Sequence, residues 1–343
     1  MKNMLLSALA ASVLLVLPHA ARAAAGDAVY LHPGQLVSAG GTQLNLYCMG
    51  SGSPTVVFDA GHQDWAPAWA AVQPEVAKWA RTCSYDRAGA GFSDAGPMPR
   101  TSERIADELH GALLKAGVTA PYVLVGHAFG GYNTRAFAYR YMRDVAGLVL
   151  IDTDTGDVDS ADMQAVNHSY FVVQGSELRA CRDAVAEGKP LAAVPPPANQ
   201  PRLTCEQRFF RGFPETAWSP ELNARMLQIA PTRLALYDAV ISELREMPAD
   251  EVYLRQHQQS FGSRPIRVLT AAGSYGDTEA TPAAVHLRHL KTEYERAQFQ
   301  AWFLGLSTNS RQTFAYHAGS GYIQFEQPDL VIDAIREVHQ LSR

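Results

Sequence analysis

The chain has 343 residues, of which 47% are hydrophobic, and 29 basic and 34 acidic side chains give it a formal net charge of −5. This acidic balance, with no run of basic residues, excludes the charge pattern of proteins that bind a nucleic-acid backbone or an anionic membrane surface. The length suits one α/β domain that carries an insertion.

Residues 1–23 have the pattern of a secretory signal peptide. Lys2 precedes an apolar run from Leu5 to Leu17, and Ala21-Arg22-Ala23 provides a small-x-small cleavage site. The run is too short to cross about 30 Å of hydrocarbon comfortably, and no cysteine follows it for a lipid, so we expect no stable membrane anchor. Cleavage removes Lys2 and Arg22, which leaves 27 basic against 34 acidic residues and a net charge of −7. The sequence therefore predicts a periplasmic or secreted protein.

Four cysteines follow the signal peptide, and an even number in an exported chain favours disulfides over free buried thiols. We expect the pairs Cys48–Cys83 and Cys181–Cys205, because each pair falls inside one structural region. The chain has no Cys-x-x-Cys, and its cysteine spacings are not those of metal ligands, so no metal site is expected.

The first half of the remaining chain alternates predicted strands and helices. An antiparallel strand pair is expected at the sheet edge within residues 36–49. Buried strands are expected at 54–60, 82–86, 122–125 and 147–152, with an amphipathic helix at 102–116. Strand rhythm returns at 266–270 and is followed by a long helix over 283–304.

A sharp turn, Gly126-His127-Ala128-Phe129-Gly130, separates the strand at 122–125 from a helical stretch at 133–142. Strand, tight glycine-flanked turn and helix form the frame of the nucleophile elbow Gly-x-Ser-x-Gly, where glycine allows a strained backbone and close packing. The position of the nucleophilic serine holds Ala128. Since a methyl group cannot attack a carbonyl, the motif supports the fold and argues against the usual chemistry.

Together with this turn, four further segments in the expected order resemble the α/β-hydrolase superfamily, in particular its exported bacterial branch. They are 56–62 (VVFDAGH), 83–93 (CSYDRAGAGFS), 147–152 (GLVLID) and 320–328 (SGYIQFEQP). The resemblance covers residues 56–338. It implies the α/β-hydrolase fold: a mostly parallel, doubly wound sheet with a helical cap inserted after the sixth strand.

The strand–turn–helix rhythm stops after Asp152, which places the insertion. We expect the hydrolase core to comprise residues 24–156 and 264–343, and the helical cap to comprise residues 157–263. Such caps enclose a pocket and exclude water. The aromatic side chains of this region would suit an apolar pocket or the cap's own core.

The resemblance also implies positions for the oxyanion hole and the triad acid. One backbone N–H would come from His62 or Gln63, after the strand at 54–60, and the other from Phe129. Backbone donors survive most side-chain changes, so the hole can persist without the serine. His62 and His127 are candidate ligand-binding side chains. Asp277 stands at the acid position, with Asp152 as the runner-up.

The general base of the family stands in Ser-Gly-His-Tyr-Ile, and here that histidine position falls on Gly321. The nearest histidine is His317, four residues earlier, which is a candidate base if the local loop differs. Two other histidines, His286 and His289, lack a third ligand and are interpreted as surface residues. Asp86 and Arg87 are expected to brace their loop by a salt bridge.

Three interpretations follow, all without a cofactor. The first is an exported α/β-hydrolase-like protein, built for ester hydrolysis, that has lost serine catalysis and binds a small hydrophobic or ester-type ligand. The second is a serine esterase with a Ser-to-Ala trapping substitution at Ala128 and His317 as base. The third is a hydrolase that uses His62, His127 or His317 on a bound water. Low or no serine-hydrolase activity is expected of the chain as written.

Overall fold

The computed structural model describes residues 26–153, 172, 174–189, 204–205, 217–273, 281–319 and 321–343. The predicted signal peptide and the acid candidate Asp277 therefore lie outside the described residues. The domain boundaries stay predictions.

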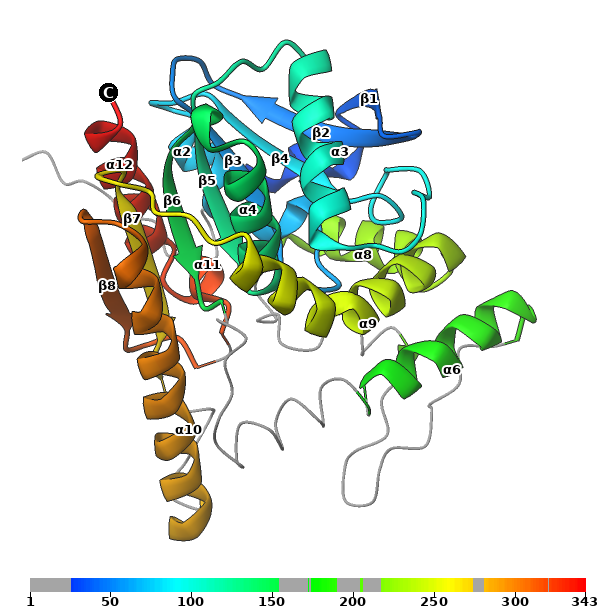
Figure 1. Cartoon of the computed structure of the whole chain (residues 1–343). Helices are drawn as coiled ribbons and strands as arrows, with labels where there is room; N and C mark the ends of the chain where they lie inside the picture. Colours follow the sequence, from blue (N-terminus) through cyan, green and yellow to red (C-terminus); the bar gives the residue numbers. More distant parts are fainter. Residues whose placement is uncertain are drawn as a thin grey trace, which may run out of the picture.

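An eight-stranded sheet forms the centre of the molecule (Figure 1), in the order β1-β2-β4-β3-β5-β6-β7-β8. The pairings β1–β2 and β2–β4 are antiparallel and the other five are parallel, which confirms the predicted mostly parallel sheet. The strands are β1 Gln35–Ala39, β2 Thr42–Met49, β3 Thr55–Asp59, β4 Thr82–Asp86, β5 Tyr122–His127, β6 Val145–Ile151, β7 Ile266–Ala271 and β8 Ser310–Ala315.

Strand β8 was not predicted, because it lacks an apolar run. It lies at the sheet edge, pairs only with β7 within the described sheet, and contains the polar stretch Ser-Arg-Gln-Thr. Its hydrogen bonds to β7, rather than its composition, place it in the sheet.

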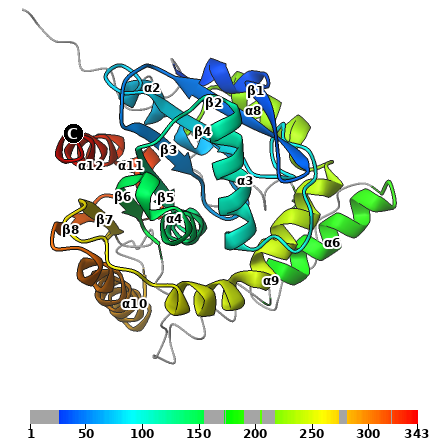
Figure 2. The ribbon, with the colours of Figure 1, turned by 45° about the horizontal axis from the view of Figure 1, so that its top comes forward.

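Helices cover both faces of the sheet (Figure 2). Two apolar cores lie between the sheet and these helices. One face packs against α3 and α4, the other against α2 and α12. The helices of this core are η1 Asp27–Leu31, η2 Ala66–Trp69, α2 Gln73–Val76, α3 Ser102–Lys115, α4 Phe129–Arg140, η3 Met142–Asp144, α10 Ala283–Ala301, η5 Trp302–Leu306, α11 Ile323–Glu326 and α12 Pro328–Leu341. This is a doubly wound arrangement, as expected from the sequence.

Three described helices, α6 Gly175–Ala186, α8 Pro220–Ile229 and α9 Leu234–Gln256, lie in the insertion between β6 and β7. Helix α9 contains Pro248 in its interior and continues beyond it to Gln256. Beyond the proline, Asp250 accepts hydrogen bonds from Ser102, and Glu251 accepts one from Tyr132. These contacts to the core stabilise the last turns of α9 against the local preference of proline.

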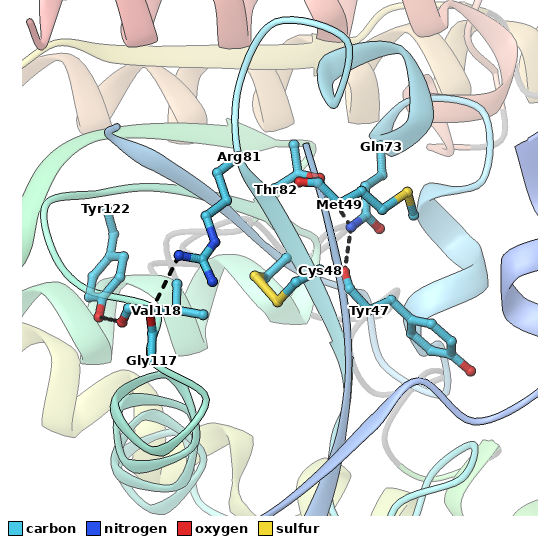
Figure 3. Close-up of a disulfide and its surroundings, with 10 residues drawn as sticks. Tyr47, Cys48, Met49, Gln73, Arg81, Thr82, Gly117, Val118 and Tyr122 are labelled. Carbon is cyan, nitrogen blue, oxygen red and sulfur yellow. Dashed lines mark hydrogen bonds between the residues drawn. A yellow bond between two sulfur atoms is a disulfide. The ribbon is translucent and has the colours of Figure 1, made fainter. Parts of the chain in front are cut away.

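Both predicted disulfides, Cys48–Cys83 and Cys181–Cys205, are confirmed. Cys48 and Cys83 are directly opposite each other on β2 and β4, with Cα atoms 4.1 Å apart, so the bridge fastens the antiparallel edge to the parallel sheet (Figure 3). Beside it, the Gln73 side chain donates a hydrogen bond of 2.7 Å to the carbonyl of Tyr47. Two disulfides are compatible with a secreted protein.

Across the helices that the structure describes, none combines the length and the apolar character needed to span a bilayer.

Candidate active site

The turn at Ala128 has the backbone of a nucleophile elbow. It joins β5 directly to α4, and Ala128 has φ 46° and ψ −116°, which an L-residue rarely adopts. Its N–H donates to Ile151 O at 2.9 Å, and its carbonyl accepts from the Thr153 hydroxyl at 2.6 Å. The chain at the end of β6 therefore holds the turn through both the N–H and the carbonyl of Ala128.

Two of the flanking glycines are required by close packing. A Cβ on Gly126 would lie 2.6 Å from Thr134 Oγ1, and one on Gly130 would overlap the carbonyl oxygen of Asp59 at the end of β3. Helix α4 thus begins against the backbone of a neighbouring strand. The glycines of the sequence motif therefore correctly predicted this close packing of the backbone.

Non-glycine residues with positive φ mark the predicted site. In the described part of the chain there are three: Gln63 at 70°, Ala128 at 46° and Asp152 at 43°. The sequence assigned these residues to the oxyanion loop, the nucleophile position and the runner-up acid. Strain of this kind costs about 1–3 kcal/mol per residue and concentrates at functional sites.

Arg87 holds the oxyanion loop in place. Its guanidinium donates to Ala60 O at 2.7 Å and Gly61 O at 2.6 Å, and forms ion pairs with Asp59 at 2.9 Å and with Glu243 of α9 at 2.8 Å. Burial disfavours its charge, but Glu243 and Asp59 keep the pKa of Arg87 above its ordinary value.

The expected salt bridge between Asp86 and Arg87 is wrong in its partners. Asp86 instead accepts from the backbone N–H groups of Ala66 and Phe92 and from Asn45. Neighbouring strand residues point to opposite sides of a sheet, which separates the two side chains. Both residues still brace loops at this end of the sheet.

Two backbone N–H groups are available for an oxyanion. Among the described residues, neither Gln63 N nor Phe129 N has a hydrogen-bond acceptor. Phe129 is also the first residue of the 12-residue helix α4, whose N-terminus favours negative charge. The predicted donors therefore remain available without a serine.

His62 is tied to the insertion. Its Nε2–H donates to Val240 O of α9 at 2.7 Å, since a carbonyl oxygen can only accept. Its ring meets Phe129 edge-on, with centroids 6.3 Å apart. Burial lowers the pKa of His62, which keeps the ring neutral. This histidine connects the oxyanion loop to α9.

The position of the family's base faces Asp152. A Cβ on Gly321 would lie 3.0 Å from Asp152 Oδ2. The Asp152 carboxylate instead pairs with Arg296 at 3.2 Å and accepts from Gln300 at 3.1 Å and from Ala271 N at 3.3 Å. Side chains of α10 thus satisfy an acid that lies where a catalytic imidazole would be oriented.

His317, the alternative base, is exposed on the turn after β8. Its backbone N–H donates to the Gln327 side chain at 2.9 Å. The structure brings Gly321, and not His317, against Asp152. The acid candidate Asp277 lies outside the described residues.

Sequence reasoning missed Asp64 and Tyr322, which lie beside His127. The His127 ring donates from Nε2 to Gly321 O at 3.1 Å, and its centroid is 5.0 Å from that of Tyr322. Asp64 Oδ1 accepts from the Tyr322 hydroxyl at 3.3 Å. Burial raises the pKa of Asp64 to about 7 and lowers that of His127 to about 4. The Asp two residues after His62 in the predicted oxyanion loop was the available sequence signal.

No group of three or more His, Cys, Asp or Glu side chains suited to a metal ion occurs within the described ranges.

Comparisons with known proteins support this architecture. Residues 54–174 match the family model described as the alpha/beta hydrolase fold. The protein YqjL of Bacillus subtilis is 33% identical over 111 residues, which are 32% of this chain and 44% of YqjL. The 2-hydroxy-6-oxo-2,4-heptadienoate hydrolase of Pseudomonas putida is 34% identical over 122 residues, 34% of this chain and 44% of that enzyme. The chain thus matches less than half the length of these relatives.

Solved structures extend the likeness over most of the chain. The epoxide hydrolase CorEH superposes with a TM-score of 0.64 at 15% identity, covering 90% of this chain and 99% of CorEH. At this identity the likeness concerns the fold. Together with the sheet order, the elbow and the family match, it shows that this chain has the α/β-hydrolase fold.

Proposed function

We propose that this protein binds a small hydrophobic, ester-type ligand over the elbow and does not hydrolyse it by serine chemistry. One observation supports this most directly: strained backbone is kept at Gln63, Ala128 and Asp152, while the hydroxyl and the imidazole are absent. The elbow, the oxyanion donors and an oriented acid are what an ester site requires of its backbone. Ala128 and Gly321 remove the two groups that would move the proton.

The trapped-esterase interpretation differs in requiring His317 as base. Against it stand the exposure of His317 and the direct approach of position 321 to Asp152. Water activation by His62 is disfavoured because its Nε2–H is directed to Val240 O. We also propose that the protein is natural in this form: it is exported, it has lost its serine site, and it has retained ligand binding.

The test uses 4-nitrophenyl butyrate as probe and separates binding from turnover. Backbone amide NMR signals of Gln63 and Phe129 report binding at the hole, and nitrophenol release reports hydrolysis. The unchanged protein should shift these signals with nitrophenol release far below that of an ordinary esterase. An oxyanion hole and a pocket alone supply about 10³–10⁴-fold acceleration over water.

Rescue variants decide between the interpretations. Ala128→Ser alone should add little, because the new hydroxyl has no base within about 3 Å. Adding Gly321→His should raise the rate by orders of magnitude over either single variant, since triad members act together. Gly321 has φ 84°, a conformation that strains a histidine at this position. A second variant therefore keeps Gly321 and inserts a histidine directly after it. A fully active Ala128→Ser protein that His317→Ala inactivates would contradict the proposal.

A further inference from the structure

A buried acid and a buried imidazole face each other beside the elbow without a hydrogen bond. Asp64 Oδ2 and His127 Nδ1 are 3.9 Å apart, and neither atom has a hydrogen-bond partner among the described residues. The two residues are only 2% and 4% exposed. Buried polar atoms without a hydrogen bond destabilise the folded protein. A proton on one of these two atoms would allow a hydrogen bond between them.

The tautomer of His127 follows from its other nitrogen. Nε2 lies 3.1 Å from Gly321 O, and a carbonyl oxygen can only accept, so Nε2 carries the proton. Burial lowers the pKa of His127 to about 4, against the opposing influence of Asp152, and the ring is neutral near pH 7. Nδ1 therefore presents a lone pair to Asp64.

An ionised Asp64 would place a second acceptor against this lone pair. Arg87, a cation whose charge acts on Asp64, is already shared by Asp59 and Glu243, and its hydrogen bond to Asp64 is to the backbone carbonyl at 3.4 Å. Burial raises the pKa of Asp64 to about 7, Arg87 and the Tyr322 hydroxyl oppose this, and Glu243 reinforces it. A protonated carboxyl would instead supply the missing donor.

Gly61 closes one side of the gap. A Cβ there would lie 2.9 Å from both Asp64 Oδ2 and His127 Nδ1. That point is one bond length from the Cα of Gly61, so the Cα excludes a bridging water from it. The same loop, residues 61–64, includes the oxyanion donor Gln63. A bond from Asp64 to His127 would therefore fix this loop to β5 next to the elbow.

We propose that Asp64 is a positioning residue: a neutral carboxylic acid whose side chain closes the 3.9 Å gap and donates a hydrogen bond to His127 Nδ1, which holds the oxyanion loop ready for a ligand. Loss of that proton breaks this hydrogen bond, so the loop, which Arg87 still holds through the carbonyls of Ala60 and Gly61, is positioned less firmly and binds the ligand more weakly. This inference rests on the proposed function for its effect on binding, but the location of the proton is independent of it.

Spectroscopy tests the proton directly. Infrared difference spectra of the unchanged protein against Asp64→Asn should show the C=O stretch of a protonated carboxyl, which disappears as the pH rises through about 7. Nitrogen-15 NMR should show His127 protonated at Nε2 and bare at Nδ1. Two results would overturn the proposal. One is an infrared carboxylate band for Asp64 at one pH unit below its pKa, which a bridging water would permit. The other is an NMR signal that places the proton on His127 Nδ1.

Binding of 4-nitrophenyl butyrate tests the consequence. In the unchanged protein Kd should rise about tenfold as Asp64 ionises, the expected result of losing one buried hydrogen bond. Asp64→Asn keeps a donor that does not titrate, so its affinity should stay at the low-pH value throughout. Asp64→Leu has no donor and should bind weakly at every pH.

The two proposals fail separately. If Asp64→Leu binds as tightly as the unchanged protein, with the same pH dependence, the positioning role of Asp64 is wrong. If none of the proteins binds the ester, the proposed function fails, while the infrared and NMR results still show whether Asp64 holds the proton.

Discussion

The two halves of the candidate site differ in what they have kept. At the elbow, residues 126–131, the backbone conformation, the glycine packing and the N–H donors are those that a nucleophile requires, although Ala128 has no hydroxyl. At the loop around Gly321 the feature that a triad requires is a side chain; position 321 holds glycine, and Asp152, which faces it, pairs with Arg296. The packing of the sheet enforces the first set of features, whereas the fold does not depend on which single side chain stands at position 321.

The largest expected effect comes from removing the cation that holds the elbow side together. Arg87→Met should destabilise the protein by about 3–5 kcal/mol, because Asp59 and Glu243 would be left buried without their counter-charge. Urea unfolding measures this loss. Arg140→Met is the control: Arg140 pairs with Asp107 and Glu103 at the surface, with 30% of its side chain exposed, and should cost at most about 1 kcal/mol. Equal losses would show that the network around Arg87 does not support the site.

A smaller effect is expected from the elbow glycine that meets β3. Gly130→Ala should cost about 2–3 kcal/mol, because the new methyl would overlap the Asp59 carbonyl and the backbone must shift. Gly305→Ala is the matched control, since nothing lies within 4 Å of its added Cβ and its φ is not positive. It should change stability by no more than about 0.5 kcal/mol. If the two substitutions cost the same, close packing does not preserve the elbow.

The sequence predicted the features that the backbone enforces. Gly126 and Gly130, the apolar strands and the paired cysteines each leave a local pattern, and the sheet, the turn and both disulfides follow from them. Contacts between distant segments leave no such pattern. The pairing of Asp152 with Arg296 joins residues 144 positions apart, and that of Arg87 with Glu243 joins residues 156 apart. The polar edge strand β8 was missed for the same reason.

The smallest expected effect tests whether the elbow stores backbone strain. The informative result is the sign of the change in the free energy of unfolding. Ala128 has a half-buried methyl group and a positive φ, which an L-residue adopts only at a cost of about 1–3 kcal/mol. Ala128→Gly removes this cost but adds freedom to the unfolded chain, so the folded protein should gain about 0.5–1 kcal/mol.

Ala136→Gly, in the interior of the same helix α4, should lose about 1 kcal/mol or more, because Ala136 is fully buried in ordinary helical conformation. Thermal and urea unfolding of the two variants compare one chemical change in two backbone conformations. Opposite signs would show that the chain maintains a strained turn for a nucleophile that it does not have. If Ala128→Gly instead loses as much stability as Ala136→Gly, the elbow is not strained, and its backbone does not store the energy expected of a nucleophile turn.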